Sequence, residues 1–363
     1  MTGNPRPDLP ALTGVRGVAA WFVVLYHIRG AAGGQLPEWL IAILAKGYLA
    51  VDLFFMLSGF VLWLNYSNKL RQGGFAAAPQ FLARRIARIW PLHLLILAGA
   101  VAFAAILQAS GRPNPAQFPW TELPLHILLI QNWGLTSALG WNDPAWSISC
   151  ELAAYLLFPL LALVADWRRL SDGVLAGIVV ATAIGLHWLM RDQPNLGSDI
   201  PRFGLARALA EFLIGTLVCA LWSSWREQPR RPLLASIAVS LLSSAALLTG
   251  AMPETLAVPF LFAALLLALA LAPANPLGSR PLHYLGEISY ATYLLHFLLF
   301  ILFKLLFVSD ASAVPLPLLG LFLALTFAGS VLLHHFVESP AQRALNRAFG
   351  RQPKAALSER AAS

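Results

Sequence analysis

The chain has 363 residues, of which 58% are hydrophobic and 12% are charged. Soluble domains carry roughly a quarter of charged residues, so this composition excludes an ordinary soluble globular protein. The formal net charge of +8 does not indicate a nucleic-acid partner, because Lys and Arg accumulate in the cytoplasmic loops of membrane proteins. We therefore expect an all-α polytopic membrane protein that contacts membrane lipids and binds no nucleic acid.

Apolar runs recur along the whole chain, and each is long enough to cross a hydrocarbon core of roughly 30 Å. We expect a single membrane-embedded domain over residues 1–345 and a cytoplasmic, disordered tail over residues 346–363. The apolar piece at 123–133 is too short to span, so it is expected to be re-entrant or interfacial. The ten predicted transmembrane helices cover residues 11–28, 47–66, 86–108, 145–165, 173–190, 204–225, 232–250, 255–272, 284–308 and 315–337.

The distribution of Lys and Arg between the loops predicts the orientation of these helices. If the N-terminus is cytoplasmic, the cytoplasmic segments hold seventeen Lys and Arg residues and the outside loops hold five. Because positive charge accumulates in cytoplasmic loops, we expect both termini in the cytoplasm, which requires an even number of spans. The N-terminus has no evident signal peptide, so the first apolar run is expected to be a retained helix.

Two ionisable residues stand in the first apolar run, "GVRGVAAWFVVLYHIRG" at 14–30. On an α-helix, the eleven positions from Arg16 to His27 make three turns plus about 20° and about 16 Å along the axis. The two side chains therefore share one face, with Arg16 towards the cytoplasm and His27 towards the outside. Ionisable groups inside spans are costly and often functional. An Arg16 that extends to the interface and a His27 that bonds a carbonyl group explain the pattern equally well.

Two carboxylates are expected at the same depth as His27. Asp52 lies in the outer half of the second predicted span, and Glu151 lies in the first turns of the fourth. A carboxylate beside an imidazole fixes its tautomer and raises its basicity, so either residue is a candidate partner of His27. A helix cap or a structural ion pair is the alternative for Asp52.

Two arginines on one helix face form a candidate anion site. In "FLARRIARIWPLHLL" at 81–95, Arg84 and Arg88 are four positions apart and share a face, whereas Arg85 is expected on another face. Paired guanidinium groups suit phosphate recognition. Anchoring to lipid phosphates is equally compatible with this feature.

The remaining polar residues of the apolar runs have structural explanations. Cys150 and Cys219 show no metal-ligand spacing, so we expect no metal site, and packing is their simplest role. Arg207 and Glu211, four positions apart, are expected to neutralise each other. The segment "LGEISYATYLLHF" at 285–297 contains tyrosines, which usually anchor helices at the membrane interface. Its polar residues include Ser289, Tyr290, Tyr293 and His296.

Six segments occur in a fixed order across residues 12–345: "LTGVRGVAAWFVVLYH", "GYLAVDLFFMLSGFVL", "RRIARIWPLHLL", "AWSISCELAAYLLFPL", "LGEISYATYLLH" and "VESPAQRAL". Together they resemble the integral-membrane acyltransferase type 3 family of bacteria. Members of that family transfer acyl groups, usually acetyl from acetyl-CoA, to exopolysaccharides, lipopolysaccharide O-antigen, peptidoglycan, cyclic glucans or macrolides. The resemblance implies a multi-pass protein of the bacterial inner membrane, with acyl-CoA as donor and a glycan or other hydroxyl compound as acceptor.

The resemblance also implies roles for individual residues. The family's arginine–histidine pattern falls on Arg16 and His27, and its histidine is regarded as the catalytic base. The pattern of two arginines linked with the acyl-CoA donor falls on Arg84 and Arg88.

A further family pattern, tryptophan–serine–x–serine–x–glutamate, ends at Glu151 and begins with the substrate-site candidates Trp146, Ser147 and Ser149. Cys150 and Leu152 stand where many relatives have bulkier or acidic residues, which is expected to alter the acceptor pocket. Some relatives carry a soluble esterase-like domain after the last span. Without one, we expect direct transfer to an acceptor or to a separate partner.

These observations predict an acyl-CoA-dependent O-acyltransferase. His27 would deprotonate the acceptor hydroxyl, and Asp52 or Glu151 would orient the imidazole. Arg16 would line the path of the donor or contact its phosphate or carbonyl groups. A transporter or flippase of an acyl or glycan species is the alternative, since about ten spans with interior charges fit that class as well. The acceptor, the choice of acetyl, succinyl or a longer acyl group, and the oligomeric state are left open.

Overall fold

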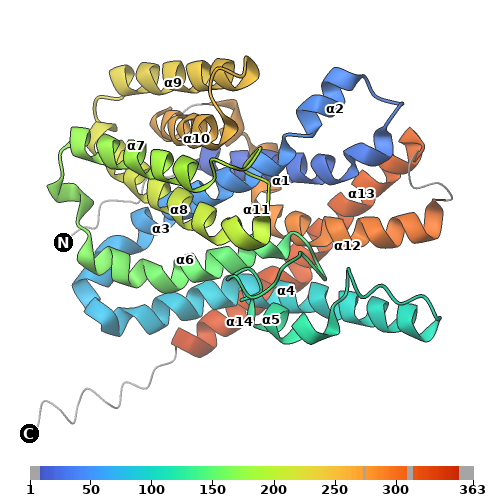
Figure 1. Cartoon of the computed structure of the whole chain (residues 1–363). Helices are drawn as coiled ribbons and strands as arrows, with labels where there is room; N and C mark the ends of the chain where they lie inside the picture. Colours follow the sequence, from blue (N-terminus) through green and yellow to red (C-terminus); the bar gives the residue numbers. More distant parts are fainter. Residues whose placement is uncertain (1–8, 273–274, 309–313, 351–363) are drawn as a thin grey trace, which may run out of the picture.

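The computed structural model describes residues 9–272, 275–308 and 314–350, and this part of the chain is helical without a strand (Figure 1). The elements therefore confirm the expected all-helical class. Ten α-helices of the described part have 18 residues or more, and each coincides with one predicted span. They are α1 (Pro10–Ile28), α3 (Ala50–Gly73), α4 (Ala78–Ala109), α6 (Ala145–Val164), α7 (Asp172–Leu189), α8 (Ile200–Trp225), α9 (Arg230–Leu248), α10 (Glu254–Leu271), α12 (Ser289–Phe307) and α13 (Leu316–Leu333).

Shorter helices join or extend these elements. The 3₁₀ turns are η1 (Arg29–Ala32), η2 (Gly47–Leu49), η3 (Gly74–Ala77), η4 (Trp120–Glu122), η5 (Trp167–Arg169) and η6 (Pro276–Gly278), and η7 (His334–Glu338) is a π-helix. The short α-helices are α2 (Glu38–Leu44), α5 (Leu123–Leu128), α11 (Arg280–Glu287) and α14 (Ser339–Gly350).

Four boundaries differ from the sequence prediction. The span expected at 284–308 is divided at Ile288 into α11 and α12, and α4 begins at Ala78 rather than at 86. Only Leu123–Leu128 of the short apolar piece is helical, because Leu129 adopts a left-handed conformation that ends the helix. Helix α14 continues to Gly350, and residues 351–363 of the expected tail lie outside the described residues.

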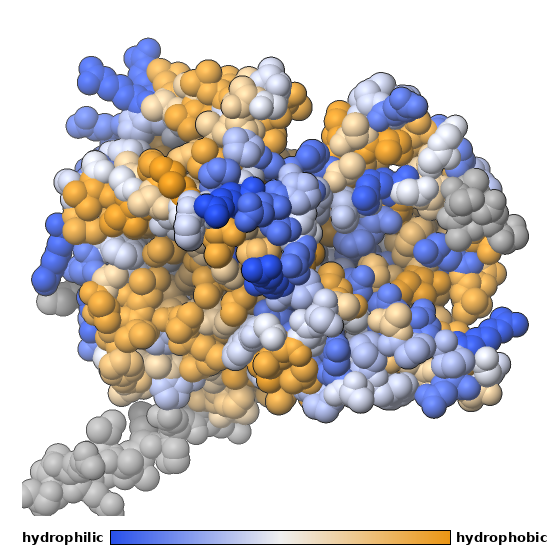
Figure 2. All heavy atoms as spheres, in the orientation of Figure 1, coloured by the Kyte–Doolittle hydropathy of each residue, from blue (hydrophilic) through white to orange (hydrophobic). Residues whose placement is uncertain are grey.

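The surface of the described helices fits a membrane environment. Nine helical stretches of this part are long and apolar enough to cross a membrane, and one of them, Glu38–Ala109, contains both α3 and α4. Helix α9 exposes Leu234, Leu241 and Leu242. Figure 2 shows broad hydrophobic areas on the face in view, with hydrophilic atoms gathered near its centre. The chain is thus a multi-pass membrane protein, while the exact number of crossings and the location of the termini stay predictions.

Helices α3 and α8 form the centre of the packing, together with α1 and α6 (Figure 1). Their backbones approach closely at two glycines. A Cβ atom at Gly59 would lie 2.0 Å from the carbonyl oxygen of Phe212, and one at Gly215 would lie 1.9 Å from that of Met56. Gly59 and Gly215 thus permit the close packing of α3 against α8. Ser58, beside Gly59 in sequence, donates a hydrogen bond to Glu151.

A buried ion pair joins the same two helices. The Nε atom of Arg207 on α8 lies 2.5 Å from Oδ1 of Asp52 on α3, and Nη2 binds Oδ2. Both side chains are almost completely buried. Glu211, the expected partner of Arg207, lies farther away, with its Oε1 4.0 Å from Nε. The prediction that Glu211 is the main partner of Arg207 was therefore wrong. The neighbouring helix α3 places the carboxylate of Asp52 closer to Arg207 than the next turn of α8 places that of Glu211.

We predict that Arg207→Met lowers thermal stability more than Asp52→Asn. Breaking a buried ion pair costs about 3–5 kcal/mol because the remaining charge has no partner. Loss of Arg207 leaves two buried carboxylates without a cation, whereas loss of Asp52 leaves Arg207 beside Glu211. The check is the unfolding temperature of each purified variant in detergent. Equal effects, or the reverse order, would contradict this assignment.

Candidate functional site

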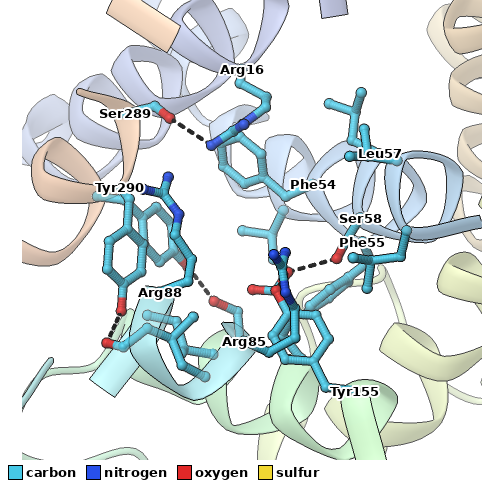
Figure 3. A pocket seen from close by; sticks show the side chains of 18 residues that line it. Arg16, Phe54, Phe55, Leu57, Ser58, Arg85, Arg88, Tyr155, Ser289 and Tyr290 are labelled. Atoms are coloured by element: carbon cyan, nitrogen blue, oxygen red, sulfur yellow. Dashed lines mark hydrogen bonds between the residues drawn. The ribbon is translucent and has the colours of Figure 1, made fainter. Parts of the chain in front are cut away.

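A cavity of about 160 Å³ lies between α1, α3, α4, α6 and α12, and we call it the arginine cavity. Arg16 of α1 and Arg85 and Arg88 of α4 line it, and Glu151 of α6 is its one lining carboxylate among the described residues. Figure 3 shows the three guanidinium groups projecting into this space. Aromatic walls complete the cavity, and they include Phe54, Phe55, Tyr155, Tyr290 and Tyr293.

The charges of the arginine cavity are unevenly compensated. Arg88 forms an ion pair with Glu338 of η7. Glu151 accepts hydrogen bonds from Ser58 Oγ at 2.7 Å and from Tyr155 OH at 2.5 Å rather than from an arginine. Arg16 has, among the described residues, a single hydrogen bond, of 3.5 Å to Ser289 Oγ. The cavity therefore presents more positive than negative charge.

Arg85 is the second cation of this cavity without a carboxylate partner in the described part of the chain. Its guanidinium lies over the rings of Tyr66 and Tyr155, and Nη2 donates to Tyr66 OH at 3.1 Å. Its buried Nε makes no hydrogen bond to any residue that the structure describes. Arg84, which the sequence assigned to the donor with Arg88, does not line the cavity. The structure thus brings Arg88 together with Arg85, three positions earlier on α4, instead of with Arg84.

A second cavity, of about 280 Å³, contains His27, and we call it the histidine cavity. Tyr26, Tyr48, Asp143 and Trp146 are among its other lining residues. Val51 and Tyr293 line both cavities, so the two spaces adjoin. The prediction that Arg16 and His27 share one face of a helix is confirmed, since each of them lines one of two neighbouring cavities.

Hydrogen-bond partners determine the tautomer of His27. Its Nδ1 lies 3.0 Å from the carbonyl oxygen of Val23 and 3.2 Å from Nε2 of His296. In His296, Nδ1 faces the carbonyl oxygen of Thr292 at 3.1 Å. A carbonyl oxygen only accepts, so both Nδ1 atoms carry a proton, and His296 Nε2 accepts from His27. This arrangement leaves Nε2 of His27 as the unprotonated nitrogen.

The carboxylates expected beside His27 are elsewhere. Asp52 is paired with Arg207, and Glu151 lies in the arginine cavity with Ser58 and Tyr155. Both were expected at the depth of His27, but depth does not determine the direction in which a side chain points. His296 occupies the position that a carboxylate would take, so the expected contact of Asp52 or Glu151 with the imidazole is corrected.

The other residues of the tryptophan–serine pattern are divided between the cavities and the packing. Trp146 lines the histidine cavity, and Ser147 lines the arginine cavity with its Oγ 2.8 Å from Tyr293 OH. Ser149 lines neither cavity and accepts a hydrogen bond from the backbone N of Asn132 at 3.1 Å. Cys150 is fully buried beside the Asn132 amide, as expected for packing.

Several site residues were missed in the sequence. Tyr290 and Tyr293 were expected at a membrane boundary, but both line the arginine cavity. For Tyr293 the sequence did contain a signal, because Ser289, Tyr293 and His296 are four and three positions apart and therefore share a helix face. Asp143, in the loop before α6, had no such signal. Burial raises the pKa of its carboxyl group, and the hydrogen bond from the Gln117 amide opposes this shift.

Comparison with known proteins gives the class of this site. The acyltransferase domain family matches residues 9–335. The chain belongs to this family. It is 34% identical to the acyltransferase MdmB of Streptomyces mycarofaciens, with 93% of both chains covered. It is 22% identical to the O-acetyltransferase OatA of Staphylococcus aureus, covering 97% of this chain and 60% of the relative. It is also 41% identical to protein 2 in the picA locus of Rhizobium radiobacter, over 44% of this chain and 84% of that one. No solved structure matches the chain.

This membership confirms the resemblance found in the sequence, and the chain is a multi-pass membrane acyltransferase. The candidate site consists of a cationic cavity and an imidazole cavity that share a wall. The family model covers α1 to α13, so both cavities lie within the matched region.

We predict that His296→Ala lowers the rate of acyl transfer about tenfold, because one hydrogen bond that orients His27 is worth roughly 1–1.5 kcal/mol. His296→Gln is expected to recover part of the rate, since its side-chain oxygen also accepts a hydrogen bond. The measurement is release of free CoA from acetyl-CoA by purified enzyme with a hydroxyl acceptor. A Gln variant as impaired as the Ala variant would indicate a packing role alone.

Proposed function

We propose that this acyltransferase moves an acyl group, most simply acetyl, from cytoplasmic acyl-CoA to a hydroxyl group of a glycan or similar acceptor. The observation that supports the proposal is the shared wall of Val51 and Tyr293 between an arginine-rich cavity and the cavity of His27. A donor with phosphates at one end and a thioester at the other suits two such neighbouring spaces. The name of the relative MdmB supports acyl transfer, and the name of OatA, an O-acetyltransferase, supports transfer of acetyl to a hydroxyl group.

The arginine cavity is the proposed donor site. Arg16, Arg85 and Arg88 line it, and guanidinium groups recognise phosphate through charge-assisted hydrogen bonds. The buried Nε of Arg85 has no partner among the described residues, which makes a ligand oxygen a suitable complement. The aromatic side chains Phe54 and Tyr290 provide apolar contacts for the thin arm of CoA.

His27 is the proposed general base. Its Nε2 takes the proton of the acceptor hydroxyl, and the hydroxyl oxygen forms a bond to the thioester carbonyl carbon. The carbon–sulfur bond then breaks, and the CoA sulfur receives the proton from Nε2 of His27. While His27 is protonated, the Val23 carbonyl oxygen and His296 Nε2 stabilise its Nδ1–H. Glu151 and Asp52 hold their own hydrogen-bond partners in this scheme and do not contact the imidazole.

We predict that His27→Ala abolishes acyl transfer while the protein still inserts in the membrane and binds acetyl-CoA. The side chain is only partly buried, and in the described part of the chain its one hydrogen bond to another helix is to His296, so its loss removes the base without breaking the fold. The measurement combines CoA release with the elution profile of the purified variant. A fully active His27→Ala enzyme would overturn the mechanism.

Arg85 and its neighbour Arg84 on α4 provide a test variant and a matched control for the proposed donor site. We predict that Arg85→Ala weakens acetyl-CoA binding by about tenfold or more, since a hydrogen bond to a charged group is worth roughly 1.5–3 kcal/mol. Arg84→Ala removes the same charge one position away without touching the cavity, so its affinity is expected to stay near that of the wild type. Equilibrium binding of radiolabelled acetyl-CoA distinguishes the two. Equal losses would point to a general charge effect, and no binding by any form would favour transport over catalysis.

A further inference from the structure

The histidine cavity contains one carboxylate, Asp143, that the mechanism above does not use. It stands in the loop before α6 and lines the same space as His27. Within the described residues it forms no ion pair with Lys, Arg or His. A carboxylate that faces a cavity and pairs with none of its cations is free to accept hydrogen bonds from a ligand.

The other charged side chains of this cavity already have partners. Arg29 bonds the backbone carbonyl of Tyr26 and stacks on its ring, 3.9 Å from the ring centroid. Arg207 is paired with Asp52. The imidazole of His27 presents Nε2 as an acceptor, as its contacts with Val23 and His296 require. The cavity thus offers two acceptor groups, one on His27 and one on Asp143, to hydroxyl donors.

The position of Asp143 is fixed by the loop that carries it. Gln117 Nε2 donates to its Oδ1 at 2.9 Å, and the carbonyl oxygen of Gln117 accepts from the backbone N of Trp141 at 2.6 Å. Trp141 is fully buried. The carbonyl oxygen of Pro144, the next residue, accepts from Tyr293 OH at 3.1 Å. The Asp143 carboxylate is therefore held between the buried Trp141 and the wall that both cavities share.

We propose that Asp143 is an acceptor-binding residue that selects acceptors with a second hydroxyl group beside the reacting one. The carboxylate accepts a hydrogen bond from the second hydroxyl, so that the first one faces Nε2 of His27. Trp146, Tyr26 and Tyr48 supply the apolar faces of the same cavity. This inference rests on the proposed function, because it requires His27 to act on an acceptor hydroxyl.

The test compares two acceptor probes of equal chain length in enzyme reconstituted in lipid nanodiscs. Octyl β-glucoside offers neighbouring hydroxyls, and 1-octanol offers a single one. Transfer of radiolabel from acetyl-CoA to each probe gives KM and kcat, and binding of radiolabelled acetyl-CoA is measured separately. The variants are Asp143→Ala and Asp143→Asn, which keeps an oxygen for the Gln117 hydrogen bond and so preserves the loop. Asp192→Ala is the matched control, because that carboxylate belongs to another loop and its side chain is 87% exposed.

We expect the wild type to prefer octyl β-glucoside, and Asp143→Ala to raise its KM about tenfold while acetyl-CoA binding and use of 1-octanol stay unchanged. Asp143→Asn is expected to give a smaller rise, and Asp192→Ala none. Three results would overturn this inference but not the proposed function. They are an equal loss of transfer to both probes, an unchanged KM in both Asp143 variants, and a wild type that binds acetyl-CoA without preferring octyl β-glucoside. A wild type that binds no acetyl-CoA would overturn the proposed function itself.

Discussion

The ion pair between Asp52 and Arg207 fixes α3 against α8, and both cavities depend on the position of α3. Removal of two charges from water is costly, and only close, multiple hydrogen bonds offset that cost. Arg207 meets this requirement with two bonds to Asp52 and a third, of 2.8 Å, to the carbonyl oxygen of Leu196. Val51, next to Asp52 in sequence, then lies in the wall between the cavities. This buried ion pair thus supports the wall between the two cavities.

The sequence predicted the helices well because apolar length is a local property. Each long run contains one long helix, although the run at 284–308 is divided at Ile288, and the eleven-residue spacing correctly placed Arg16 and His27 on the same face. The choice among Arg84, Arg85 and Arg88 was not local. Positions three and four apart are both neighbours on a helix, so spacing alone cannot decide which pair faces a cavity that other helices form.

The carboxylates also show that spacing within one helix does not determine which neighbouring helix a side chain faces. Asp52 was expected beside His27, and their helices α1 and α3 do contact each other, but the rotation of α3 turns Asp52 towards α8 instead. That rotation follows from the contact of Gly59 and Gly215 with the opposing backbones, which no pattern within α3 reveals. The position of Asp143 was harder still to predict from the sequence, because it depends on the path of a loop anchored by Gln117.

Tyr293 connects the two parts of the site. Its hydroxyl group lies 2.8 Å from Ser147 Oγ and donates to the carbonyl oxygen of Pro144, so α12 is bonded to the beginning of α6. On the same helix, His296 contacts His27. The segments 146–151 and 289–296 therefore build the partition jointly. Under the proposed function, this partition is where the thioester and the acceptor meet.

Glu338 distinguishes Arg88 from the other two cations of the arginine cavity, Arg16 and Arg85. It is buried, pairs with Arg88, and lies 3.2 Å from His334 Nδ1 within η7. A donor phosphate would have to displace this carboxylate or share Arg88 with it, and near a buried carboxylate a second anion is repelled. Arg16 and Arg85 carry no such competitor in the described part of the chain. Under the proposed function, they are therefore the cations from which an incoming phosphate gains most, while Arg88 keeps η7 attached to α4.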